Sequence, residues 1–213
     1  MIRFENVTTK NFDSLSFEIE KASAYKIITN SDYENRELLN IMLGLEKPEY
    51  GRVFIFNEDL CTLPEKELGR LFSRVGAVLI DGGMISNLKV WENIVLPVWY
   101  HSGKISEDIE KKAIQRFEET GMDISYLGEL MGKLPGPLPV HEKRLIGFIR
   151  ASLLEPELMI YDSIFEGLSP EMSETLIRVS GTFHSGKAGR TSVYITPDEQ
   201  SVEGIKADTV LRL

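Results

Sequence analysis

The sequence predicts an α/β fold with a mostly parallel core sheet, a small antiparallel β annex and an inserted helical subdomain. Strand-length apolar runs alternate with amphipathic helical runs at both ends of the chain, as in parallel sheets covered by helices. Two short runs of alternating apolar and polar residues open the chain, and helical periodicity fills its middle. We expect one domain over residues 1–213, with the α/β core at 1–83 and 156–213 and the helical subdomain at about 84–155.

The composition is that of a folded globular protein. The 213 residues are 42% hydrophobic and 27% charged, and the net charge is -9, which argues against broad binding to nucleic acid or to an anionic membrane. The single cysteine, Cys61, excludes an intrachain disulfide. No signal-peptide core opens the chain, and no apolar run is long enough to span a bilayer. We expect a cytoplasmic protein that reaches the inner face of a membrane only through a partner.

The first part of the chain predicts strands and short helices in alternation. Residues 2–7 and 15–19 alternate in polarity like half-buried strands, and the turn between them leaves Phe12 exposed. A strand begins at Tyr25, and a helix follows from about Asp32. Further elements are a strand at 52–56, a helix from Pro64 to about residue 73, and a fully buried strand at 75–80.

The second part begins with helices and returns to strands. Helical periodicity runs from Val90 to about Leu154, with breaks at 103–104, 121–123 and the proline-rich 134–139. Later elements are a buried strand at 158–161 ended by Asp162, a helix at 170–184, a strand at 192–196, a helix at 198–207 and a strand at 209–213. Residues 181–187 have phosphate-loop spacing, but they follow a helix and precede a strand, so we expect a flexible surface loop there.

Residues 25–45 have the frame of a phosphate-binding site without its chemistry. A strand, a polar loop and a helix follow one another, which is how many proteins place phosphate at a helix start. The loop has no glycine and no lysine, and it carries Asp32, Glu34 and Glu37. Ser31 and Glu34 fit a capping box, with Ser31 as N-cap and Glu34 reaching back to its backbone. We therefore expect a self-capped helix that begins around Asp32.

The order of segments resembles the ATP-binding subunits of ABC transporters over nearly the whole chain. The likeness is strongest to ATPases of Mla-type, MCE-associated lipid-transport systems, which carry Gln-Asp-Gly followed by Val-Trp-Glu-Asn. Here Ile-Asp-Gly-Gly at residues 80–83 is followed by Leu-Lys-Val-Trp-Glu-Asn at residues 88–93. Other matches to the family are Leu-Gly-Leu at 43–45 with Lys-Pro at 47–48, Arg-Ala at 150–151, Pro-Glu-Leu at 156–158, and Gly-Leu at 167–168 before Pro170. The resemblance implies the P-loop NTPase-like ABC ATPase fold.

The same resemblance implies that the ATP-site motifs are degenerate. The phosphate loop falls on residues 29–37, and the Leu-Ser-Gly-Gly signature on 138–141. The vestigial nucleotide site comprises Phe12, which would stack on adenine, with Thr29, Asn30, Ser31, Asp32, Glu34, Asn35, Arg36 and Glu37. The family's phosphate-loop lysine, γ-phosphate-sensing glutamine, catalytic glutamate, D-loop aspartate and switch histidine fall on Asn35, Ile80, Ser163, Ser169 and Pro197, while Asp162 matches the metal-supporting aspartate.

These losses argue against nucleotide hydrolysis. A phosphate loop needs glycine's conformational freedom and a lysine charge. Carboxylates in their place repel an anion about 4 Å away by roughly 1 kcal/mol in water. Arg36 offsets one of them, so weak nucleotide binding stays open, but no residue is left to act as catalytic base. We expect no catalytic residues, no cofactor and no metal, with Asp162 as a leftover polar residue; Mg-ATP is the cofactor if the alternative below holds.

An apolar cluster after residue 83 predicts a partner surface. The resemblance implies that this region receives a cytoplasmic helix of a membrane permease. We assign Met84, Ile85, Leu88 and Trp91 to that surface, while Val90, Ile94 and Val95 are expected in the core. The expected partners are a permease subunit and an active ABC ATPase subunit, without nucleic acid or direct membrane insertion. Without ATP between subunits, we expect a monomer or an atypical dimer.

Three functional hypotheses follow. The first is a non-hydrolytic, structural or regulatory subunit of a lipid-transport-like ABC complex. The second is an ATPase that energises an ABC transporter through an unorthodox or partner-completed site. The third is a free-standing interaction protein that uses the same fold away from any transporter. Mg-ATP binding and turnover separate the first two, and association with a permease separates the first from the third.

Overall fold

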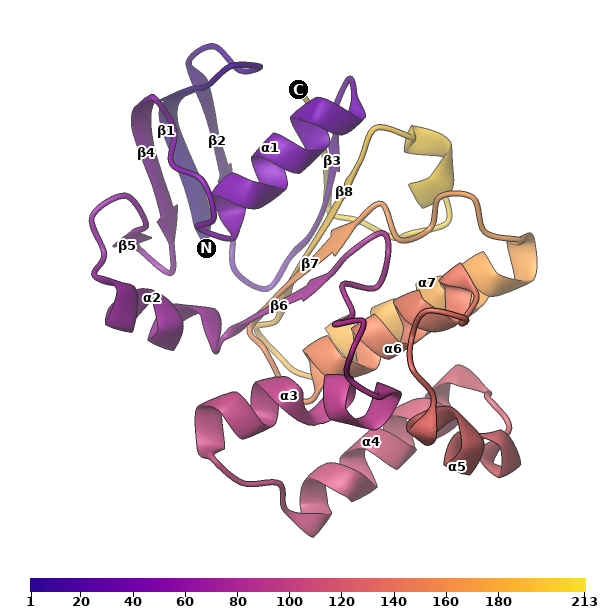
Figure 1. The fold of residues 1–213 in the computed structure, drawn as a ribbon. Helices are drawn as coiled ribbons and strands as arrows, with labels where there is room; N and C mark the ends of the chain where they lie inside the picture. The colour runs from indigo at the N-terminus through magenta and orange to yellow at the C-terminus, as the bar shows by residue number, and fades with distance from the viewer.

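The computed structural model describes residues 1–213, apart from the side chain of Ile124. Two sheets form the α/β part of the molecule (Figure 1). The parallel sheet has the strand order β6-β7-β8-β3-β9, with bounds β3 Ala24–Ile28, β6 Val75–Val78, β7 Leu158–Asp162, β8 Thr191–Thr196 and β9 Thr209–Arg212. The antiparallel sheet has the order β2-β1-β4-β5, with bounds β1 Ile2–Thr8, β2 Leu15–Ile19, β4 Tyr50–Ile55 and β5 Glu58–Asp59. The mostly parallel sheet and antiparallel annex are as predicted.

The parallel sheet is covered on both faces because its central strands are apolar on both sides. On β8, Val193 and Ile195 face a core shared with the annex and with α1 (Asp32–Met42). Tyr194, between them, faces the core formed with α6 (Val140–Ser152) and α7 (Pro170–Ser185). All residues of β7 and β8 are buried, as expected for strands sandwiched between helices.

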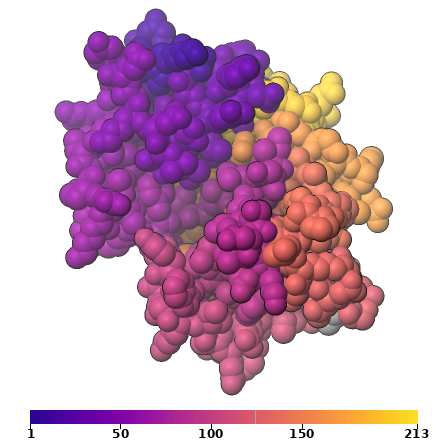
Figure 2. Space-filling model, in the orientation of Figure 1, coloured from indigo at the N-terminus to yellow at the C-terminus, as the bar shows by residue number. Residues whose placement is uncertain are grey.

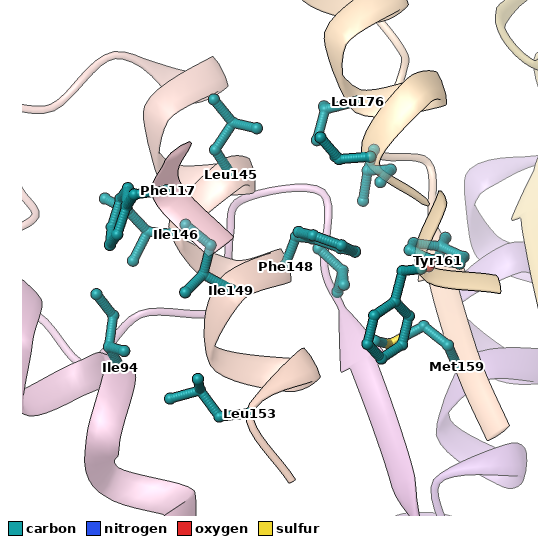
Figure 3. Packing of buried hydrophobic residues seen from close by; sticks show 14 of the residues in the cluster. Ile94, Phe117, Leu145, Ile146, Phe148, Ile149, Leu153, Met159, Tyr161 and Leu176 are labelled. Atoms are coloured by element: carbon teal, nitrogen blue, oxygen red, sulfur yellow. The ribbon is translucent and has the colours of Figure 1, made fainter. Parts of the chain in front are cut away.

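The helical block lies between β6 and β7 in the chain and at the opposite end of the molecule from the annex (Figure 1). It comprises α3 (Val90–Ser102), α4 (Glu107–Thr120), α5 (Ile124–Gly132) and α6. Gly103 and Gly121 end α3 and α4 at φ 69° and 78°, a conformation that glycine adopts without strain. Figure 3 shows Ile146 and Ile149 of α6 near Ile94 of α3 and Phe117 of α4.

Some predicted elements differ in the structure. The strand predicted at 75–80 ends at Val78, where its pairing with β7 ends. It is an edge strand of the sheet and is only alternately buried. The helix α2 (Glu65–Phe72) begins after Pro64, which is its N-cap. The helix at 198–207 reduces to one 3-10 turn, η1 (Glu199–Val202), started by the Asp198 side chain. Residues 181–185 belong to α7 rather than to a loop.

The prediction for the side chain of Phe12 is wrong. The ring was expected to be exposed, but the residue is only 7% exposed and belongs to the core beneath the annex. The turn folds it inward, since Thr9 N donates to Phe12 O at 2.9 Å and Phe12 N donates to Thr9 Oγ1 at 3.1 Å. Burial of an aromatic ring is favourable, and the turn supplies the geometry. Among the described residues, no helix is long and apolar enough to cross a bilayer.

Candidate functional site

The start of α1 is capped by side chains of its own segment. Ser31 is the N-cap, and its Oγ accepts from Glu34 N at 3.3 Å. Glu34 Oε2 accepts from Asn30 N at 2.8 Å and from Asn30 Nδ2 at 3.1 Å. The predicted N-cap and the start at Asp32 are confirmed. The predicted return bond to the Ser31 backbone is wrong, because the Glu34 carboxylate reaches one residue further back.

Asn35 joins the two strand ends of the site. Its Nδ2 donates to Asp162 Oδ1 at 2.6 Å and to Ser163 Oγ at 3.4 Å. Its Oδ1 accepts from Thr29 Oγ1 at 3.4 Å. All four residues are buried, none more than 8% exposed. The contact is possible because β3 and β7 both flank β8 as parallel strands, so their carboxyl ends meet beside α1.

Asp162 has an unusual charge environment. Burial raises the pKa of its carboxyl to about 6, while hydrogen bonds from the Ile80 backbone and Asn35 act against that shift. The Glu166 and Asp81 charges raise the pKa further. Asp162 was expected to be a leftover polar residue, and in the structure it accepts a hydrogen bond from the Asn35 side-chain amide.

Arg144 of α6 holds the loops around this carboxyl from the helical block. It is 5% exposed, and it donates to Ile80 O at 2.6 Å through Nε and to Ile164 O at 3.0 Å through Nη1. The same Nη1 donates to Glu166 O. Burial lowers the pKa of the Arg144 guanidinium, and the Glu166 and Asp162 charges oppose that shift. Sequence reasoning missed Arg144, for which the only signal was a charged residue on an otherwise apolar helix face.

Glu37 ties α1 to the turn between β1 and β2. Its Oε2 accepts from Thr9 Oγ1 at 2.8 Å, from Asn11 Nδ2 at 3.0 Å and from Asn11 N at 3.2 Å. Asp32 and Arg36 are exposed on the first turns of the helix. The carboxylate of Glu37 therefore organises the turn that buries Phe12.

The remaining motif positions have structural contacts. Ser163 is buried at φ 50°, and its N donates to Ile195 O at 2.9 Å. Ser169 is the N-cap of α7, with Oγ accepting from Met172 N at 3.4 Å. Ile80 is 40% exposed, and Pro197 directly follows β8.

The expected partner segment lies on the surface between the core and the helical block. In Figure 2 the magenta atoms that precede α3 occupy the middle of the view. Ile85 is 43% exposed, and Met84, Leu88 and Trp91 are half-buried. Asn93, fully buried, holds this segment: its Oδ1 accepts from Ile85 N at 2.7 Å, and its Nδ2 donates to three backbone carbonyls of the segment.

An apolar groove opens beside Trp91. It has a volume of about 320 Å³ and is lined by residues of α3, α4 and α5, namely Trp91, Glu110, Ala113, Ile114, Phe117, Leu127, Gly128 and Met131. Ile114, 48% exposed, lies on the open side, whereas Phe117 is in the core. Sequence reasoning found Trp91 but missed Ile114 and Met131. The apolar residues at 113, 114 and 117 were the available signal, since they form a stripe wider than the core needs.

Comparisons with known proteins identify the architecture. No protein-family model matches the chain. The dimeric bacterial ABC transporter cassette MJ0796 superposes with a TM-score of 0.85, covering 100% of this chain and 94% of its own at 21% identity. The chain has the ABC ATPase fold. The ABC transporter protein cbiO1 from Clostridium perfringens is also similar, with a TM-score of 0.73 at 20% identity over 92% of this chain and 78% of its own.

Sequence relatives of this ABC-type chain are ATP-binding subunits of ABC transporters. The methionine import ATP-binding protein MetN of Rhizobium meliloti is 25% identical over 97% of this chain and 56% of its own length. The intermembrane phospholipid transport system ATP-binding protein MlaF of Haemophilus influenzae is 22% identical over 96% of this chain and 77% of its own. The chain spans about half the length of the MetN relatives it matches. MlaF is an Mla-type relative of the kind that the sequence resemblance implied.

The ABC ATPase fold raises the question of whether this site fits Mg-ATP. Among the described residues, the hydrogen bonds made by side chains of 29–37 involve no lysine or arginine. Two carboxylates, those of Glu34 and Glu37, face the loop and turn instead. The position of the phosphate-binding lysine is Asn35, which donates to Asp162. This set of side chains does not fit a triphosphate, which requires cations and free backbone N–H groups.

Proposed function

We propose that this chain is a pseudo-ATPase, a non-hydrolytic structural or regulatory subunit of an ABC complex. The observation that carries the proposal is the 2.6 Å hydrogen bond from Asn35 to Asp162. It joins the positions that match the phosphate-binding lysine and the metal-supporting aspartate of the family. Both polar groups are satisfied by each other, so the arrangement is stable without nucleotide.

The catalytic positions support the same conclusion. Ser163 stands where the family has its catalytic glutamate, and a hydroxyl at neutral pH is no general base without a neighbouring base to activate it. Ile80 and Pro197 carry no side-chain hydrogen-bond donor. Hydrolysis would need a positioned water and a base, and the family's positions for these roles carry Ile80, Ser163 and Pro197. The nearby Glu166 carboxylate accepts from Thr196 Oγ1 instead. The proposed function therefore involves no catalytic residue, no metal and no nucleotide cofactor.

We further propose that the segment of Met84, Ile85, Leu88 and Trp91, with the adjoining apolar groove, receives a cytoplasmic helix of a permease. The groove is lined mainly by apolar side chains and carries Glu110 at its edge, which suits an amphipathic helix with a basic residue. The chain would then lie at the inner face of the membrane, held there by the permease. A second, active ABC ATPase subunit would supply the energy, and the chain alone would be a monomer or an atypical dimer.

A lipid-transport-like complex is our preferred setting. It is supported by the stretch from 80 to 93, which resembles Mla-type ATPases, and by the similarity to MlaF. The MetN relatives are named for methionine import, so an amino-acid importer is the competing setting. Co-purification of the chain with its permease, followed by mass spectrometry of the bound small molecules, distinguishes phospholipid from methionine.

Calorimetry of the pure protein with Mg-ATP tests the pseudo-ATPase proposal. We expect no saturable heat and no phosphate release. Micromolar binding with magnesium-dependent phosphate release would contradict it and support the alternative, an ATPase with an unorthodox or partner-completed site, which the retained Asp162 favours. Failure to co-purify with any membrane protein would support the third hypothesis, a free-standing interaction protein.

A further inference from the structure

A cavity on the far side of the parallel sheet from α1 combines basic and apolar residues. It has a volume of about 520 Å³ and lies between α7, the sheet and the turn after η1. Volumes of this order are typical of small-molecule sites. Tyr194, which lines the cavity, points away from the side of β8 that packs toward α1. The cavity therefore lies on the other face of the sheet from the degenerate nucleotide site, and it shares no lining residue with the groove at Trp91.

The lining of this cavity carries positive charge in an acidic protein. Arg178 and Lys206 line it together with the hydroxyls of Thr182 and Ser185. His184 also lines it, but burial lowers the pKa of its imidazole, which is therefore neutral at pH 7. No carboxylate lines the cavity, although the chain has 33 acidic and 24 basic residues. The Asp208 carboxylate lies next to the lining and accepts from Ala24 N at 2.8 Å. This local reversal of charge favours an anion.

Neither of these two cations has an acidic partner among the described residues. Arg178 donates to the backbone carbonyls of Glu119 and Thr120, at 2.7 and 3.4 Å. These bonds position its guanidinium without neutralising its charge. Lys206 is exposed and makes no salt bridge in the described part of the chain. Both charges remain available to a ligand at the cavity.

The rest of the lining is apolar and leaves room. Ile177, Tyr194 and Ile205 provide an aliphatic and aromatic wall. At Gly181, on the cavity side of α7, a Cβ atom would meet nothing within 4 Å. A ligand that fits this lining has an acidic group for the cations and an apolar body for the wall.

We propose that this cavity binds a small organic anion, a carboxylate or phosphate carried on an apolar or aromatic body. The anionic group lies between Arg178 and Lys206, and the body packs against Tyr194 and Ile205. The cavity shares no lining residue with the nucleotide-site positions or the groove, so its ligand occupies neither of them.

The test is a titration of isotope-labelled protein comprising residues 1–213, followed by NMR, with benzoate and phenyl phosphate as probes. We expect saturable shifts at the Gly181, Gly204 and Lys206 amides, with a Kd on the order of 1 mM for molecules of this size. Benzoate binding assigns a carboxylate ligand, phenyl phosphate binding a phosphate ligand, and either supports the proposal. No saturable shifts from either probe, or equal shifts from benzylamine, would overturn it.

Matched variants locate the binding. Lys206→Gln should weaken binding of the probe about tenfold through loss of a charge-assisted contact, whereas Lys112→Gln, which removes an exposed and unpaired charge on α4, should not. Gly181→Leu should abolish binding by filling the cavity, and Gly69→Leu, at another helical glycine with open space, should not. Equal affinity of Lys206→Gln and wild-type protein would refute the site even if Gly181→Leu failed to fold.

Discussion

The Asn35 side-chain amide donates a 2.6 Å hydrogen bond to Asp162, 127 residues away in the chain. Asn35 is 4% exposed and Asp162 is 8% exposed. Because water has little access to either side chain, each serves as a hydrogen-bond partner of the other. The bond connects the first buried turn of α1 to the end of β7. It is the contact that joins the two halves of the degenerate site.

Asn35→Ala should destabilise the protein by about 1–3 kcal/mol, because it leaves the buried Asp162 carboxyl without its amide donor. Urea unfolding monitored by circular dichroism measures the change. Arg36→Ala, at the exposed neighbouring position, is the control and should change stability by less than about 0.5 kcal/mol. Equal effects of the two substitutions would show that the bond contributes nothing.

The Asp162 carboxyl should make stability fall as pH rises. Its pKa is raised from 3.8 to about 6 in the folded protein, so the folded state binds the proton more tightly than the unfolded state. Stability from this group is full below pH 3.8 and is lost up to about pH 6, by about 3 kcal/mol. Asp162→Asn should remove this part of the pH dependence in unfolding experiments at pH 4 to 7. An unchanged pH profile would contradict the raised pKa.

Ser31→Ala should cost about 1 kcal/mol of stability, because the Glu34 N–H then loses its acceptor at the start of α1. Thermal unfolding measures this loss. Asp32→Ala is the matched control, because Asp32 is exposed in the first turn and contributes only to the helix dipole. A larger loss from Asp32→Ala would mean that helix charge, rather than the cap, stabilises this start.

Rebuilding the phosphate loop should create ATP binding without hydrolysis. The combined variant Thr29→Gly, Asp32→Gly, Glu34→Gly, Asn35→Lys and Arg36→Ser restores backbone freedom, the lysine and a hydroxyl. Calorimetry should detect Mg-ATP binding at least about tenfold tighter than any wild-type signal. Phosphate release should stay at background, since Ser163 remains. The same variant with Asn35 retained is the control, and ATP binding by wild-type protein of equal strength would contradict the proposal.

Ile114→Glu should disrupt association with a permease while leaving the fold intact. Ile114 is 48% exposed at the groove, so a charge there remains solvated in the free protein but is buried in the complex. Co-purification with the membrane fraction measures the effect. Ile105→Glu, at a residue that is 39% exposed outside the groove, should have no effect. Loss of association by both variants would refute the groove as the docking site.

Local sequence determined those helix and strand boundaries that depend only on residues a few positions apart in the chain. Gly103 and Gly121 end helices because only their own backbone conformation is needed. Ser31 begins α1 because its oxygen reaches an N–H three residues away. The alternation of strands and helices was likewise readable, since burial on a sheet or helix imposes periods of about 2 and 3.6 residues.

The tertiary structure decided what depends on distant neighbours. The Phe12 ring is buried because the turn at 9–12 folds it into the core. The strand predicted at 75–80 ends at Val78, where its pairing with β7 ends. Residues 198–207 have helical composition, but only one turn forms between β8 and β9. The resemblance of the sequence to ABC ATPases implied that Asn35 stands in place of the phosphate-loop lysine and that Asp162 matches the metal-supporting aspartate. Only the packing of β3, β7 and α1 placed them in contact. The two residues are 127 positions apart in the chain, and the parallel sheet brings their segments together.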